Sequence, residues 1–66
     1  MLNLTQAREC AEQELRRLEY PITELTYVTG PGTAEGWVGW VFDSEPTATR
    51  CFVNAVTGRV TVNTLD

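Results

Sequence analysis

Residues 36–42, Gly-Trp-Val-Gly-Trp-Val-Phe, form the only run in the chain that is apolar on both sides of a two-residue alternation. A strand with this pattern is typical of the middle of a sheet, where both of its faces need cover. The flanking segments are then expected to pair with this strand or to cover it.

The length and composition indicate a single small domain over residues 1–66. The apolar fraction of 42% and the charged fraction of 21% are those of a folded protein rather than a disordered tail. A domain of this size buries only roughly 60% of the surface that its unfolded chain exposes, so its stability margin is thin. Such domains commonly gain stability from a disulfide, a metal or a partner.

The net charge is −4, and all five basic residues are arginines. Only Arg16 and Arg17 are adjacent, so the chain lacks the basic stripe that displaces counterions from nucleic-acid phosphates. The acidic balance agrees with simple solubility and also with steering toward a basic partner. We therefore expect no nucleic-acid partner.

The N-terminal residues 1–5 have neither the basic start nor the long apolar run of a signal peptide, and no segment reaches membrane-spanning length. We expect a cytoplasmic protein with no membrane partner. Cys10 and Cys51 would stay reduced there and act as small buried side chains, although a bridge between them is conceivable.

A helix is predicted over residues 6–19, with Thr5 as its N-cap and Pro21 beyond its end. Glu12 and Arg16 are spaced for an i, i+4 ion pair on its outer side. Spacings of three and four residues define an apolar stripe facing the sheet, made of Leu4, Ala7, Ala11, Leu15 and Leu18.

Glu14 lies at the edge of this stripe, near Cys10 and Ala7. A carboxylate held in a pocket there would have a raised pKa and could act as a general acid. Alternatively, its side chain reaches past its small neighbours to water or to Arg17. We expect the second arrangement, because no other catalytic group is placed to assist.

Strands are predicted at residues 22–28, 37–42, 49–54 and 60–63. Residues 29–36 are expected to form a loop with Pro31 and Gly32 in a type II turn, and residues 43–46 a short turn. The last turn is expected to use the side chain of Asn54 and a positive φ at Gly58.

Short connections favour an antiparallel meander of three to four strands with the N-terminal helix across one face, which is an α+β fold.

Few residues suggest catalysis. The chain has no histidine to activate a nucleophile, and its single serine, Ser44, lies in a predicted turn. Two cysteines without histidine are too few for a zinc site, and Asp43 with Glu45 is too small a set for a hard cation. The glycines of residues 30–36 do not match a phosphate-binding pattern. We therefore predict no enzyme, no cofactor and no metal site.

Gly36-Trp37-Val38, followed after a turn by Phe52-Val53-Asn54-Ala55-Val56-Thr57-Gly58-Arg59-Val60, resembles the YrhB-like group of small bacterial immunity proteins. The second segment also resembles the end of PepSY-type modules. Asn54 and Arg59 depart from the acidic residues usual in these families. The resemblance implies a leading helix, a sheet, and a protein that binds another protein without catalysis. Members of the group include presumed toxin antidotes and a chaperone-like heat-shock protein.

The alternation alone does not decide which face of residues 37–42 is buried. The YrhB-like pattern places Trp37 inward with Val41, and we then expect Cys51 and Val53 to face the helix. The open face would carry five predicted partner-binding residues, namely Val38, Trp40, Phe42, Arg50 and Phe52. The alternative is a core that extends further, with Tyr20, Tyr27 and residues 29–36 folded over this face.

The sequence therefore favours a small acidic immunity or inhibitor protein, of bacterial or phage origin, that blocks a toxin or other effector. The alternative is a self-associating or chaperone-like subunit, including a homodimer formed through the same face.

Overall fold

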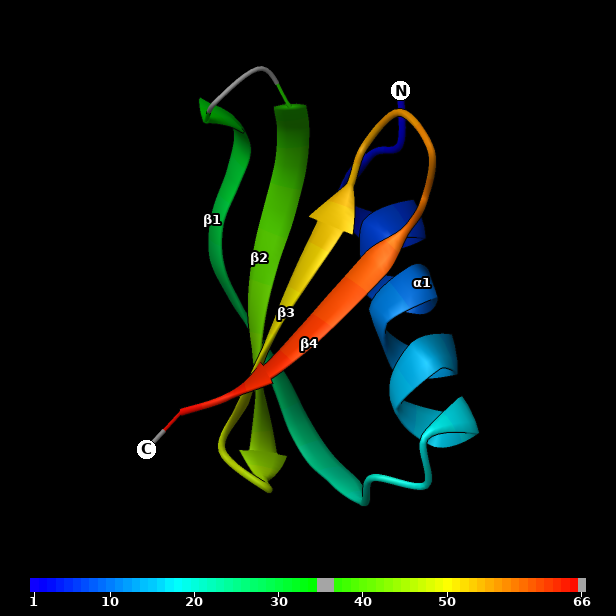
Figure 1. Cartoon of the computed structure of the whole chain (residues 1–66), viewed down its shortest axis with the longest axis vertical. Helices are drawn as coiled ribbons and strands as arrows, with labels where there is room; N and C mark the ends of the chain where they lie inside the picture. Colours follow the sequence, from blue (N-terminus) through cyan, green and yellow to red (C-terminus); the bar gives the residue numbers. More distant parts are fainter. Residues whose placement is uncertain (35–36, 66) are drawn as a thin grey trace.

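The chain forms one helix and a four-stranded antiparallel sheet, which confirms the predicted α+β meander (Figure 1). The computed structural model describes the backbone of residues 1–34 and 37–65, with the side chains of 33, 34 and 37 outside the description. The sheet order is β1-β2-β3-β4, so β1 and β4 form its edges. The elements are α1 (Leu4–Arg17), β1 (Ile22–Ala34), β2 (Trp37–Pro46), β3 (Thr49–Asn54) and β4 (Val60–Thr64).

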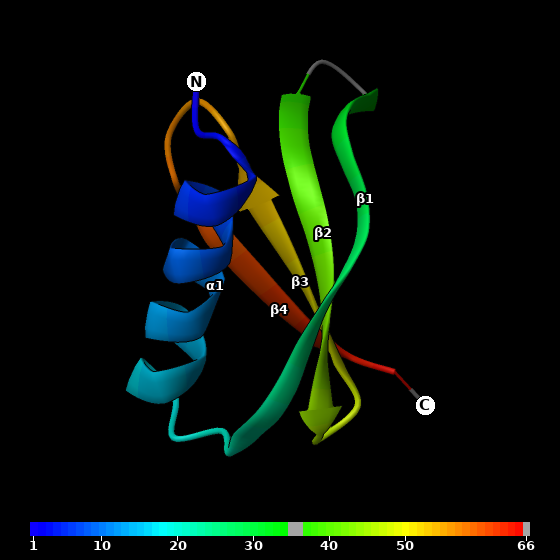
Figure 2. The ribbon, with the colours of Figure 1, turned by 180° about the vertical axis from the view of Figure 1, so that it is seen from behind.

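Helix α1 lies against one face of the twisted sheet, with the start of β4 beside it, and its C-terminal end leads directly into the start of β1 (Figures 1 and 2). The opposite face of the sheet carries no helix. In the part of the chain that the structure describes, no helix combines the length and apolar character needed to cross a bilayer.

Helix α1 begins two residues earlier than predicted, and Thr5 as N-cap is wrong. Asn3 is the N-cap, because its Oδ1 accepts from Gln6 N at 2.8 Å while Gln6 Oε1 accepts from Asn3 N at 3.0 Å. This reciprocal capping box satisfies two amides that a helix start leaves unpaired. The central residues of the predicted stripe, Ala7, Ala11 and Leu15, are fully buried. Its two end residues, Leu4 and Leu18, are exposed instead.

Strands β1 and β2 are longer than predicted, and the predicted loop is wrong over residues 29–34, including its type II turn at Pro31 and Gly32. Residues 35 and 36 of that prediction lie outside the described residues. Strand β1 continues to Ala34, and Gly32 pairs with Gly39 of β2. The pairing of β1 with β2 shifts register at three points, two of which lie between Tyr27 and Gly32. Gly30, within this irregular part of β1, has a φ of +134°. The predicted turn at 43–46 is also strand, because β2 continues to Pro46, which pairs with Ile22.

The C-terminal hairpin agrees with the prediction. Strand β3 spans Thr49–Asn54 as expected, and Asn54 Oδ1 accepts from Val56 N at 2.8 Å and from Thr57 N at 3.0 Å. Gly58 has a φ of +77°, which the turn requires and an L side chain rarely adopts. Strand β4 ends one residue later than predicted.

The prediction that Trp40 and Phe42 lie on an open face is wrong. Phe42 is 0% exposed and Trp40 is 9% exposed, and both belong to the core between the sheet and α1. The reason is the strand register: Trp40 pairs with Val53, and Phe42 pairs with Cys51. Directly paired residues point to the same face of a sheet. Cys51 and Val53 face the helix, as predicted, so Trp40 and Phe42 face the helix as well.

Val38 is half-buried and packs against the same core, so its predicted place on the open face is also wrong. The inward placement of Trp37 falls on a side chain outside the described residues. Val41 is paired with Phe52 on the face away from α1, so its predicted inward placement is wrong.

The alternative core, with Tyr20, Tyr27 and residues 29–36 folded over the predicted open face, is confirmed for the two tyrosines, which lie next to core residues. It is not confirmed for Phe52, which lies on the opposite face. The Tyr27 ring lies 6.2 Å from the Trp40 ring and 6.4 Å from the Phe42 ring, measured between centroids. Tyr20 is half-buried against the core.

The residue that precedes the helix is fastened to the sheet. Leu2 N donates to Ala55 O at 2.7 Å, and Leu2 O accepts from the indole Nε1 of Trp40 at 3.2 Å. The N-terminal end of α1 is therefore held by β2, through Trp40, and by the turn after β3, through Ala55.

Candidate protein-binding face

The face of the sheet away from α1, called the outer face below, is the strongest candidate site. The register places its residues in cross-strand pairs: Glu24 with Glu45, Thr26 with Asp43, Asp43 with Arg50, Val41 with Phe52, Arg50 with Asn63, and Phe52 with Thr61. Of the five predicted partner-binding residues, Arg50 and Phe52 lie here, and both are half-buried.

Val41 and Phe52 form the apolar centre of the outer face. They are directly paired, and both are partly accessible. An aromatic side chain beside arginine is a combination often found at the centre of protein interfaces. Val41 is not among the predicted binding residues, because the expected inward placement of Trp37 carries Val41 into the core by alternation.

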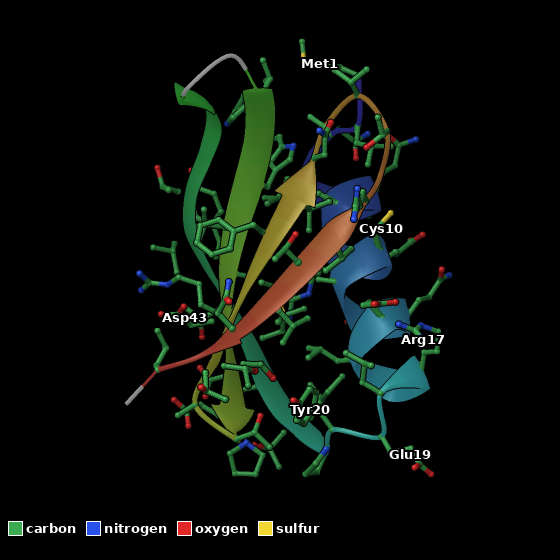
Figure 3. The ribbon with its side chains drawn as sticks, in the orientation of Figure 1. Met1, Cys10, Arg17, Glu19, Tyr20 and Asp43 are labelled. Atoms are coloured by element: carbon green, nitrogen blue, oxygen red, sulfur yellow. The ribbon has the colours of Figure 1, made fainter. Side chains whose placement is uncertain are left out.

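Asp43 and Arg50 form a two-pronged ion pair next to this centre. Arg50 Nε donates to Asp43 Oδ1 at 2.8 Å, and Arg50 Nη2 donates to Oδ2 at 3.1 Å. The guanidinium hydrogen bonds hold the pKa of Asp43 below its usual value, while partial desolvation opposes the shift. Figure 3 shows Asp43 on the side of the sheet remote from α1. The pair fixes the direction of both side chains on the outer face.

The β1–β2 end of the outer face is acidic. Glu24 and Glu45 are directly opposite each other and are exposed. Thr26 Oγ1 donates to Glu24 Oε1 at 3.2 Å, but no arginine of the described chain forms an ion pair with either carboxylate. Like charges placed directly across two strands destabilise a sheet. A basic partner surface would relieve this repulsion.

The β3–β4 end of the outer face is hollowed. The hollow has a volume of about 240 Å³. It is lined by Phe52, Asn54, Arg59 and Thr61. Arg59 was not predicted as a site residue, although alternation from Thr61 places its side chain on this face.

A second hollow separates α1 from the start of β4 and has a volume of about 520 Å³. Its walls include Cys10, Glu14 and Arg17 from α1 and Gly58 and Val60 from the hairpin, and Figure 3 shows Cys10 and Arg17 on this flank.

The structure confirms that Glu14 reaches Arg17. Arg17 Nε donates to Glu14 Oε1 at 2.8 Å, and Nη2 donates to Oε2 at 2.7 Å. These hydrogen bonds lower the pKa of Glu14, whereas a general acid needs a raised pKa. The hollow beside α1 therefore holds no activated acid.

The remaining nucleophilic side chains are poorly placed for chemistry. Both cysteines are free thiols. Burial raises the pKa of Cys51 to about 11, with a further contribution from Asp43, so its reactive thiolate is scarce near neutral pH. Ser44 Oγ is buried and makes no hydrogen bond within the described chain. Among the described residues, no three acidic, cysteine or histidine side chains cluster as metal ligands.

Comparison of the chain with protein-family models, with curated protein sequences and with solved structures gives no match.

Proposed function

We propose that this chain is a non-catalytic binding module that attaches through its outer face to a basic surface of a protein partner, and blocks that partner as an immunity or inhibitor protein does. The observation that carries the proposal is the Glu24–Glu45 pair, two exposed carboxylates placed directly opposite each other on a face without a helix. The partner's arginines or lysines would supply the missing counter-charge.

The pattern of the outer face supports a protein rather than a small molecule as the partner. Its centre is Val41 with Phe52, and the Asp43–Arg50 ion pair and the two glutamates lie toward one side of it. An apolar centre with polar surroundings is the usual composition of a protein interface. The hollow beside Phe52 and Arg59, at about 240 Å³, is smaller than the usual pocket for a small-molecule ligand.

The net charge supports a basic partner. At −4, the protein would be steered toward a positive surface, and opposite charges increase the association rate at low salt. The likeness of Gly36–Val38 and Phe52–Val60 to YrhB-like immunity proteins favours the same class. The proposal places this binding in the cytoplasm, where the free thiols of Cys10 and Cys51 stay reduced.

A pair of charge-matched double variants tests the proposal. Glu24→Gln with Glu45→Gln removes two charges from the outer face, and Glu9→Gln with Glu19→Gln removes two charges from exposed positions elsewhere. Each form, tagged, is used to capture proteins from a lysate of the source cell, followed by quantitative mass spectrometry. Captured proteins are then purified and titrated against all three forms at low salt and at about 0.5 M salt.

We expect a basic protein that binds the wild type and the Glu9/Glu19 variant, and binds the Glu24/Glu45 variant at least about tenfold more weakly. High salt should reduce the difference, because surface charge interactions are screened. Equal binding by both double variants would contradict the role of the outer face. Broad, salt-insensitive capture of unfolded proteins by all three forms would favour a chaperone-like subunit instead.

A further inference from the structure

The free edge of β4 is less protected than the free edge of β1. Strand β1 contains Pro31 and three register shifts, features that blunt a sheet edge against pairing with another chain. Strand β4 pairs with β3 in unbroken register, from Val60 opposite Val53 to Thr64 opposite Thr49. It also contains no proline and no charged residue. Its free edge is therefore open to a further strand.

The hydrogen bonds at the two ends of β4 show which backbone groups face outward. Arg59 O accepts from Asn54 N at 2.8 Å, and Leu65 N donates to Ala48 O at 2.7 Å. Along an antiparallel strand, the backbone N–H and C=O groups of successive residues point to opposite sides, so those of residues 59, 61, 63 and 65 point toward β3. The N–H and C=O groups of Val60, Val62 and Thr64 then face away from the sheet.

One end of β4 adjoins hollows, and the other end is followed by an exposed apolar side chain. The start of the strand adjoins both hollows, one on the outer face beside Arg59 and one on the α1 side beside Val60. The end of the strand is followed by Leu65, a large apolar residue that is 41% exposed. Alternation from Thr61 places Leu65 on the outer face. The strand thus has open space at one end and an exposed apolar side chain at the other.

We propose that β4 pairs antiparallel with β4 of a second copy of this chain, across a twofold axis at Val62, and joins the two sheets into one. In this register Val62 pairs with Val62 of the second copy, and Val60 pairs with Thr64. All outward N–H and C=O groups of these three residues are then hydrogen-bonded in both copies. A twofold interface is self-complementary, as this pairing requires.

The same register brings the complementary ends together. Leu65 of the second copy lies opposite Arg59, next to the hollow of the outer face, and Thr64 lies opposite Val60, next to the hollow beside α1. No two like charges are opposed, because β4 carries none. Cys10, Glu14 and Arg17 of α1 line the hollow beside the start of β4, so the added strand would have helix side chains next to it. These features favour a second copy over an unrelated peptide, which would not supply the leucine at this position.

The inference is independent of the proposed function, because Glu24 and Glu45 belong to β1 and β2. Val62→Pro removes an outward N–H while the β3–β4 hydrogen bonds of Thr61 and Asn63 remain. Val62→Thr is the matched control, since it keeps the N–H and the branched side chain. Both are compared with the wild type by sedimentation velocity from about 10 μM to about 1 mM, with circular dichroism as the test of folding.

We expect a wild-type dimer, a Val62→Thr dimer, and a dissociation constant at least about tenfold higher for Val62→Pro, because two interface hydrogen bonds are lost per dimer. A second measurement needs no variant. Amide exchange of Val60, Val62 and Thr64 in the wild type should slow as concentration rises, while Thr61 and Asn63 are protected at every concentration. A wild type that stays monomeric throughout would overturn the proposal. So would a dimer that Val62→Pro leaves intact, or one that the Glu24/Glu45 variant disrupts instead.

Discussion

Truncation of Phe42 and of Phe52 should have very different effects on stability, because the two side chains lie on opposite faces of the sheet. Phe42 is fully buried between the sheet and α1, whereas Phe52 is half-buried on the outer face. Replacing a fully buried phenylalanine by alanine costs about 3–5 kcal/mol, from lost burial and the cavity left behind. A half-buried position on a helix-free face should cost about 1 kcal/mol.

The cost of truncating Phe42 is large relative to the total free energy of unfolding of the domain. A chain of 66 residues has a free energy of unfolding of roughly 3–10 kcal/mol, at about 0.05–0.15 kcal/mol per residue. Phe42→Ala should therefore remove about a third or more of the free energy of unfolding, and if the total is near 3 kcal/mol, half or more of the molecules are unfolded. Phe52→Ala should remain folded and should weaken partner binding.

Urea unfolding followed by circular dichroism provides the measurement. With a slope of about 1 kcal/mol per molar urea, Phe42→Ala should lower the midpoint by about 3 M or more, and Phe52→Ala by about 1 M. Phe42→Leu removes less volume than Phe42→Ala and should cost less, so it supplies a measurable transition if the alanine variant does not fold. Equal losses for the two alanine variants would refute the assignment of the faces.

Three further predictions concern single positions. Gly30→Ala should lower the free energy of unfolding by about 2 kcal/mol or more, since the new Cβ would lie 2.9 Å from Gly39 O at a φ of +134°. Gly32→Ala is the control and should be near neutral, because its new Cβ would have no atom within 4 Å. Thermal unfolding measures both. Asn3→Ala should cost about 1 kcal/mol through loss of the helix cap, measured in the same way. Cys51 should react with iodoacetamide only as the protein unfolds, and stability should fall as pH rises from about 9 toward 11, because the unfolded thiol ionises while the buried thiol keeps its proton.

The parts of the fold that depend on local sequence could be predicted. The helix stripe of Ala7, Ala11 and Leu15 follows from helical periodicity, and the β3–β4 hairpin follows from Asn54 and Gly58. The capping box was also readable, because an Asn followed three residues later by Gln is its signature, but Thr5 offered a competing cap.

The burial of Trp40 and Phe42 could not be predicted in the same way. A strand that is apolar on both faces carries no periodic signal for its buried side, and a one-residue shift of register reverses it. The structure resolves the choice through the pairing of β2 with β3, in which Phe42 lies opposite Cys51. The opposed carboxylates of Glu24 and Glu45 could not be predicted either, because the sequence predicts a turn at residues 43–46, and the pairing depends on β2 continuing to Pro46.

The attachment of Leu2 to the indole of Trp40 makes this side chain a spectroscopic reporter. The indole gains solvent when the segment before α1 detaches, so its fluorescence emission should shift to longer wavelength at that moment. A Trp37→Phe variant would leave Trp40 as the single emitter. Stopped-flow refolding of that variant would then time the docking of the segment before α1 onto Trp40, to be compared with the gain of secondary structure that circular dichroism follows.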